Sequence, residues 1–105
     1  MISGQILSEA VYRLVEKFHP EKIILFGSQA RGTADSHSDV DLLVISNIKE
    51  KRRKLMTDMR RVLDKLEYAF DVIILTREEF ERDSKIPGTI GRYASREGKI
   101  LYEQT

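Results

Sequence analysis

The chain has 105 residues, of which 41% are hydrophobic and 33% are charged, and its formal net charge is +1. This balance is typical of a folded protein and excludes a disordered or low-complexity segment. The absence of cysteine excludes disulfides, zinc–thiolate sites and thiol catalysis. Charges interrupt the amphipathic N-terminal stretch, so we expect neither a signal peptide nor a membrane span, and a cytoplasmic protein. The length predicts a single domain over residues 1–105.

Helix and strand patterns alternate along the chain. Apolar residues three and four apart predict helices, expected over residues 4–18, 28–31 and 47–67, after a Thr76/Glu79 capping pair, and between Pro87 and Gly98. Short β-branched runs predict strands, expected over residues 22–26, 40–45, 70–75 and 99–102. The small and polar residues of 32–38 predict a loop.

The long helix separates the second and third predicted strands. A strand–helix–strand passage from residue 40 to residue 75 is a crossover, which favours parallel neighbouring strands. We therefore expect an α/β (α+β) fold, a small mixed β-sheet packed with helices.

The first predicted strand ends in a turn suited to an anion. Gly27 allows a tight backbone turn, and Ser28 can open a short helix whose free N–H groups face a phosphate. Arg31 adds a planar donor fork that matches phosphate oxygens. Taken singly, these residues have ordinary explanations, since Gly-Ser also forms simple strand-to-helix turns and Arg31 can be a surface residue. Together they predict a nucleotide-binding turn at Gly27, Ser28 and Arg31.

Three aspartates stand at the starts of two predicted strands. Asp39 and Asp41 are two residues apart, and such residues project from one face of a strand. Two carboxylates on one face repel each other unless a cation lies between them. If the two parallel strands have a similar register, Asp71 projects beside this pair. No lysine or arginine adjoins the pair in sequence, so the three aspartates predict a metal site.

Such a site suits nucleotidyl transfer. Three carboxylates can hold two Mg²⁺ ions roughly 3.5–4 Å apart, with Asp39 and Asp41 bridging both ions. Asp71 would bind the ion nearest the nucleophile and help remove its proton. The expected reaction is attack at the α-phosphate of a nucleoside triphosphate, with pyrophosphate leaving. His37 precedes the aspartates, and an exposed loop histidine explains it better than a nucleotide contact.

Residues 49–61 form the concentrated basic segment. A solvated helix face is the favoured interpretation, while nucleic-acid contact and docking to an acidic partner stay open. The segment lacks the interleaved aromatics that favour single-strand binding, so nucleic acid is not an expected partner. Tyr102 carries a hydroxyl that can accept a nucleotide, but its setting favours an ordinary strand residue.

The compound motif resembles a known family. It comprises Gly27-Ser28-Gln29-Ala30-Arg31-Gly32, then Ser38-Asp39-Val40-Asp41-Leu42, and finally Asp71. In this motif and in the order of its elements the chain resembles the minimal nucleotidyltransferases (MNT) of the DNA polymerase β-like superfamily. The resemblance implies the core fold of that superfamily, with ATP as substrate and Mg²⁺ as cofactor. It also implies an antitoxin of the MntA type, which transfers AMP to a tyrosine of a HEPN-domain toxin.

Two alternatives to this function stay open. One is an antitoxin without catalysis, which neutralises its partner by binding and occlusion. The other is nucleotidyl transfer to a small molecule or an RNA end, where a homodimer could supply the missing part of the site. A chain this short has little left to grip a large second substrate, so we expect the acceptor on a partner protein in a homo- or hetero-oligomer.

Overall fold

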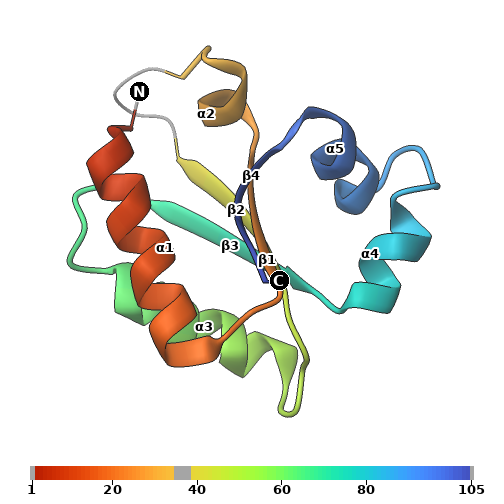
Figure 1. The fold of residues 1–105 in the computed structure, drawn as a ribbon, viewed down its shortest axis with the longest axis horizontal. Helices are drawn as coiled ribbons and strands as arrows, with labels where there is room; N and C mark the ends of the chain where they lie inside the picture. Colours follow the sequence, from red (N-terminus) through yellow and green to blue (C-terminus); the bar gives the residue numbers. More distant parts are fainter. Residues whose placement is uncertain (1, 35–38, 105) are drawn as a thin grey trace.

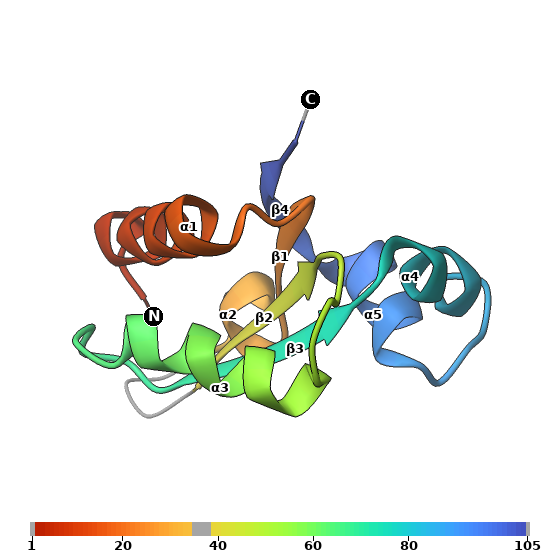
Figure 2. The same cartoon turned by 90° about the horizontal axis from the view of Figure 1, so that it is seen from below.

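The computed structural model describes residues 2–34 and 39–104. The helices are α1 (Gly4–Phe18), α2 (Ser28–Arg31), α3 (Arg52–Leu63), α4 (Arg77–Asp83) and α5 (Ile90–Glu97), and the strands are β1 (Lys22–Phe26), β2 (Val40–Ile45), β3 (Phe70–Leu75) and β4 (Lys99–Glu103). Helices flank both faces of one four-stranded sheet (Figure 1 and Figure 2). The predicted α/β class is therefore confirmed.

The strand order β3-β2-β1-β4 makes the sheet mixed. β1 runs antiparallel to both β2 and β4, whereas β2 and β3 are parallel and are joined through α3. The register places Asp41 opposite Asp71. The predicted parallel pairing and its similar register are thus both confirmed.

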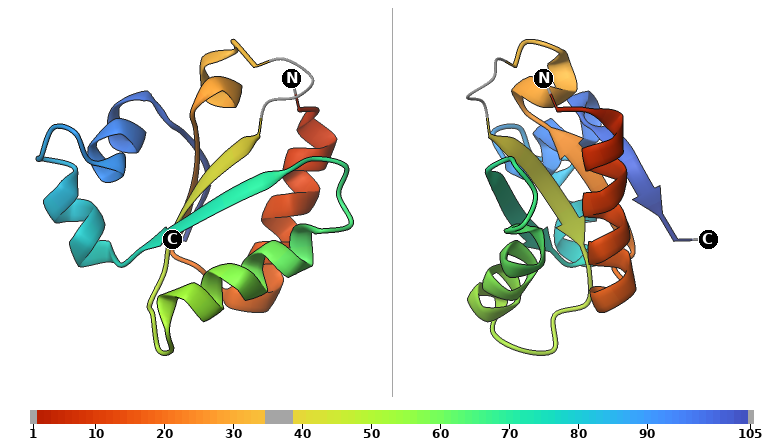
Figure 3. Two further views of the ribbon diagram at one scale, coloured as in Figure 1. Left: turned by 180° about the vertical axis from the view of Figure 1, so that it is seen from behind. Right: turned by 90° about the vertical axis from the view of Figure 1, so that its left-hand side faces the viewer.

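Each face of the sheet has its own hydrophobic core. On one face, α1 and α3 cover the larger cluster, which includes Leu14, Leu42 and Met59, all with no exposed surface. On the other face, α4 and α5 accompany a smaller cluster around Leu43 and Ala94. Figure 3 shows the two helix pairs on opposite sides of the sheet. Burial of each large apolar side chain stabilises the fold by roughly 1.5–3 kcal/mol, so the larger cluster contributes more of this stabilisation than the smaller one.

The predicted helix ends are largely confirmed. Ser3 Oγ accepts a hydrogen bond from the backbone N–H of Ile6 at 3.2 Å and so caps the start of α1. His19, in the left-handed conformation with φ 49°, ends this helix. Across residues 2–34 and 39–104, no helix has the length and apolarity that crossing a membrane requires.

The prediction for the long helix was wrong at both ends. α3 begins at Arg52 after Lys51, and not at the expected residue 47. Glu50 pairs with Lys54 at 3.4 Å, and Ile48 packs against the larger core, which holds the preceding segment outside the helix. At the other end the backbone tightens after Leu63, whose carbonyl accepts from Leu66 at 3.0 Å, and the helix stops short of residue 67.

Glu79 stabilises the start of α4 as a charged group. Its carboxylate accepts hydrogen bonds from the Arg52 guanidinium at 2.8 Å and from the Thr76 backbone N–H at 2.9 Å. These bonds, that from Arg52 foremost, lower the pKa of Glu79 from 4.5 to about 2. Because the folded-state pKa is depressed, its stabilisation is present above 4.5 and is lost as the pH falls toward about 2.

We therefore predict that Glu79→Gln lowers the free energy of unfolding at pH 7, and that its difference from the wild type shrinks between pH 4.5 and pH 2. Denaturant unfolding at a series of pH values measures this difference. Glu78→Gln, an exposed residue of the same helical turn, is the control. Equal stability of the two variants at pH 7 would contradict the assignment.

Candidate functional site

One row of residues crosses three neighbouring strands. Phe26 of β1 lies opposite Asp41 of β2, and Asp41 lies opposite Asp71 of β3. Side chains alternate along a strand, so Asp41 shares the face of Leu43, which belongs to the smaller core beside α5. Neighbouring strands are about 4.8 Å apart, which makes the two carboxylates direct neighbours on that face. The predicted convergence of Asp41 and Asp71 is confirmed at the level of register and face.

Asp41 carries the clearest electrostatic signal of the row. Its partial burial raises the pKa of its carboxyl above the ordinary 3.8, and the nearby charges of Asp71 and Asp39 raise it further. The positive charge of Arg31 opposes this rise. Negative charge therefore exceeds positive charge around Asp41, and a cation bound there would relieve the repulsion.

Asp39 lies outside the strand. It directly precedes Val40, the first residue of β2, and it is exposed. β2 begins at Val40, as expected, so Asp39 lies directly before the strand, and its place on the same face as Asp41 stays a prediction. The charge of Asp39 nevertheless acts on Asp41. The predicted loop residue His37 lies outside the described residues, as does Ser38.

Gly27 brings the turn after β1 into direct contact with Asp41, which forms an acidic row with Asp71. Its backbone has φ 77° and ψ −157°, a combination that only glycine adopts readily, and it precedes the first residue of α2. A Cβ atom at Gly27 would lie 2.3 Å from Oδ2 of Asp41, closer than real Cβ contacts come. Gly27 of the predicted nucleotide-binding turn therefore lies directly against Asp41 of the predicted metal site.

The remaining residues of the turn are held by α2. Backbone N–H groups of Ala30 and Arg31 both donate to the Gly27 carbonyl at 3.1 Å, and Ser28 is half-buried at the start of the helix. The Arg31 guanidinium donates to the hydroxyl of Tyr93 on α5. Since Arg31 also acts on the pKa of Asp41, its charge lies near the acidic row. The structure thus gathers Gly27, Ser28 and Arg31 beside Asp41.

Asp71 has a basic partner, Arg60, that does not adjoin it in the sequence. Nη2 of Arg60, on α3, lies 3.2 Å from Oδ1 of Asp71, and both side chains are about half exposed. An exposed ion pair contributes only about 0–1 kcal/mol, so it can be exchanged for another cation at little cost. The basic segment therefore reaches the acidic row through Arg60.

Other basic residues of this segment are engaged in ion pairs. Arg52 binds Glu79 at 2.8 Å, and Lys54 lies 3.0 Å from Asp58. These pairs agree with a solvated helix face, the favoured interpretation of residues 49–61.

The donor chemistry of the acidic row fits a hard divalent cation. Carboxylate oxygens are the ligands that Mg²⁺ prefers, and the pKa of Asp41 is raised first by its partial burial and then by the neighbouring carboxylates. Within the part of the chain that the structure describes, however, no group of three or more histidine, aspartate or glutamate side chains is assembled as a metal site. The row is therefore a pair of neighbouring carboxylates with Asp39 at its margin.

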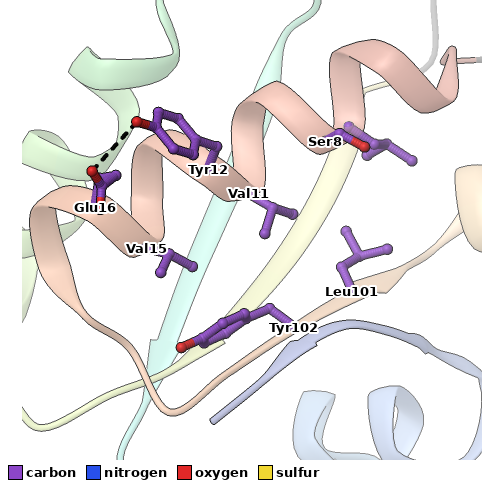
Figure 4. A pocket seen from close by; sticks show the side chains of 8 residues that line it. Ser8, Val11, Tyr12, Val15, Glu16, Leu101 and Tyr102 are labelled. Carbon is purple, nitrogen blue, oxygen red and sulfur yellow. Dashed lines mark hydrogen bonds between the residues drawn. The ribbon is translucent and has the colours of Figure 1, made fainter.

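A separate groove lies between α1 and β4, on the other side of the sheet. Its volume is about 340 Å³, and apolar side chains including Val11, Val15 and Leu101 line it (Figure 4). Tyr102 also lines the groove and packs against the larger core. Its position agrees with an ordinary strand residue, as expected, and not with an acceptor beside the acidic row.

Two residues near the site were missed by the sequence analysis. Arg60 and Tyr93 lie 11 and 62 positions from their partners Asp71 and Arg31. Neither residue belongs to a motif, and Arg60 is one of several charged residues of the basic segment 49–61. Only the packing of α3 and α5 against the sheet brings them to the site.

The contact between Gly27 and Asp41 has a measurable consequence. We predict that Gly27→Ala destabilises the fold by about 1–3 kcal/mol or more, because the methyl group meets Asp41 and the backbone conformation is strained. The control is Gly88→Ala, where φ is also positive at 90° but no atom lies within 4 Å of the new Cβ. Gly27→Ala should therefore cost more than Gly88→Ala in denaturant unfolding.

A double-mutant cycle isolates the steric part. In an Asp41→Ala background the cost of Gly27→Ala should shrink, with a coupling free energy of about 0.5–3 kcal/mol, whereas Gly88→Ala should stay additive. Additive behaviour of Gly27→Ala and Asp41→Ala would contradict the contact.

Comparisons with known proteins agree with this arrangement. Two relatives from Methanocaldococcus jannaschii are provisionally named protein adenylyltransferases. One is 52% identical over 52 residues, which are 48% of this chain and 35% of the relative. The other is 33% identical over 103 residues and is covered over 94% of its length, with 91% of this chain matched. The chain therefore spans about a third of the first relative and nearly all of the second.

Solved structures share the fold at low sequence identity. A Sulfolobus solfataricus protein described as a nucleotidyltransferase superposes with a TM-score of 0.65 at 22% identity, over 95% of this chain and 79% of its own. A mutant MntA–HpeT toxin–antitoxin complex gives 0.62 at 20% identity, over 100% and 76%. A toxin–antitoxin structure with AMP-PNP gives 0.58 at 20% identity, over 92% and 73%.

The family model described as "Nucleotidyltransferase domain" matches residues 7–96, a range that contains the Gly27 turn and all three aspartates. The resemblance seen in the sequence motif is thereby confirmed. The chain belongs to the nucleotidyltransferase domain family.

Proposed function

We propose that this nucleotidyltransferase transfers AMP from ATP to a tyrosine hydroxyl of a HEPN-type toxin, in a Mg²⁺-dependent reaction, and acts as its antitoxin. The contact of Gly27 with Asp41 carries this proposal, because it sets a turn suited to phosphate against a row of carboxylates. The names of the two relatives support protein adenylylation, and the toxin–antitoxin neighbours in fold support the partner class.

The residues of the turn would bind the triphosphate. Gly27 leaves room for a close backbone approach, and Ser28 would donate to the β- and γ-phosphates. The guanidinium of Arg31 would add charge-assisted hydrogen bonds to the same oxygens. This binding would orient the α-phosphate toward Asp41 and Asp71.

The aspartates would hold the metal and manage the proton. Asp39, Asp41 and Asp71 would hold Mg²⁺, two ions being expected, and the bound metal would neutralise phosphate charge and acidify the attacking hydroxyl. The tyrosine oxygen attacks the α-phosphorus, its new O–P bond replaces the bond to pyrophosphate, and pyrophosphate leaves. Asp71 would accept the hydroxyl proton, since its carboxylate is about half exposed on the edge strand β3.

The exposure of Asp71 also supports a protein acceptor. Because β3 is the edge of the sheet beside the acidic row, a second molecule can approach Asp71 without displacing a strand. The acceptor tyrosine would enter at this edge, where the partner would supply the remaining surface of the site.

The test uses the chain, ATP, Mg²⁺ and the protein encoded by the adjacent gene, with intact mass spectrometry of that protein. We predict an added AMP on a tyrosine, lost with the combined Asp39→Ala and Asp41→Ala variant. Asp64→Ala, which removes an exposed aspartate outside the row, should keep the transfer. Thermal unfolding would confirm that all variants fold.

Two results would contradict the proposal. One is the absence of any AMP adduct with the wild-type chain, and the other is an adduct that persists in the double alanine variant. If that variant still neutralised the toxin in cells, binding and occlusion would be the better explanation of antitoxin action.

A further inference from the structure

Close packing fixes helix α5 on strand β1. Ala94 is 2% exposed in the smaller core, and a Cβ atom at Gly98 would lie 2.4 Å from Cγ2 of Ile24. The absence of a side chain at Gly98 thus lets the end of the helix approach the strand closely. As a result, a side chain next to Ala94 on α5 has a well-defined position relative to β1.

Tyr93 is that side chain, and it contacts one residue on either side of the Gly27-Ser28 turn, Phe26 before it and Arg31 after it. Its ring meets the ring of Phe26 edge-on, with centroids 6.2 Å apart and an interplanar angle of 74°. Its hydroxyl accepts a hydrogen bond from Nη1 of Arg31, and the guanidinium carbon lies 6.0 Å from the ring centroid. Tyr93 therefore joins the last residue of β1 to the last residue of α2.

This contact restricts a side chain that is otherwise free to move. Arg31 is exposed, and ordering an exposed arginine side chain costs conformational entropy. A bond from Nη1 to Tyr93 orients the planar fork while leaving its other N–H groups available to an anion. Part of the ordering cost is then met before the nucleotide binds.

We propose that Tyr93 is a positioning residue of the nucleotide site, holding the Arg31 guanidinium in the orientation that receives the phosphates of ATP. The proposal rests on the proposed function, and it makes α5 part of the nucleotide site. Tyr93 acts through Arg31 and exchanges no proton or phosphate itself.

Tyr93→Phe tests the proposal, because it removes the hydroxyl and keeps the ring against Phe26. Titration calorimetry with Mg²⁺ and a non-hydrolysable ATP analogue should show affinity reduced roughly three- to tenfold. The midpoint of thermal unfolding should stay close to that of the wild type. Tyr12→Phe is the matched control, since Tyr12 is 60% exposed on α1 and its hydroxyl bonds Glu16, and it should bind as the wild type does.

A double-mutant cycle separates positioning from a general structural role. In an Arg31→Ala background, Tyr93→Phe should cause no further loss of affinity, because the side chain that it positions is gone. In steady-state assays the Tyr93→Phe variant should raise the KM for ATP more than it lowers kcat. The Nε–H resonance of Arg31 should also report greater side-chain motion by NMR relaxation.

The outcomes distinguish the two proposals. If the wild type binds the nucleotide and Tyr93→Phe binds equally well, the role of Tyr93 is overturned while the proposed function stands. A loss that adds in full to that of Arg31→Ala would overturn it as well. If the wild-type chain binds no nucleotide, the proposed function itself fails, and the role of Tyr93 fails with it.

Discussion

The site depends on the contact between Gly27 and the carboxylate of Asp41. Because Phe26 and Asp41 are paired across the antiparallel strands β1 and β2, the chain that leaves β1 must pass directly beside that carboxylate. Only a residue without a side chain, with positive φ, can make the turn there. This constraint fixes the start of α2, and with it Arg31, next to the acidic row. The parallel pairing of β2 with β3 then adds Asp71 on the other side.

The same arrangement places several charged side chains on one face of the sheet, and these charges do not stabilise the fold. Burial and the neighbouring carboxylates raise the pKa of Asp41, so its ionised form is disfavoured in the folded chain. Arg31 near Asp41 and Arg60 beside Asp71 offset the repulsion only in part, and the Arg60 pair is exposed. Residues kept in spite of such a cost are characteristic of functional sites, where activity and stability oppose each other.

Local patterns explain which parts of the structure could be predicted from the sequence. The bounds of α1, β1, β2 and β3 follow from clear apolar periodicity and from Gly and Pro at the ends of the elements. The length of the crossover predicted that β2 and β3 are parallel, and hence that Asp41 and Asp71 are neighbours.

The rest depends on tertiary packing that no local pattern records. The start of α3 is polar, so periodicity could not place it, and the preceding Ile48 packs against the larger core. Arg60 and Tyr93 reach the site from α3 and α5, helices on opposite faces of the sheet, so nothing local marks them as its neighbours.

Ionisation of Asp41 next to Asp71 costs the fold stability, and a bound cation would offset that cost. The most direct measurement is the free energy of unfolding of the wild type and Asp41→Asn between pH 3 and pH 8, without metal or nucleotide. Since the folded-state pKa of Asp41 is raised, the penalty is absent below the ordinary value of 3.8, grows as the pH rises above that value, and is complete above the folded pKa. We predict that Asp41→Asn is the more stable protein at pH 7 and that its advantage disappears in acid. An Asp41→Asn variant that is less stable than the wild type at pH 7, or a difference that does not change with pH, would contradict it.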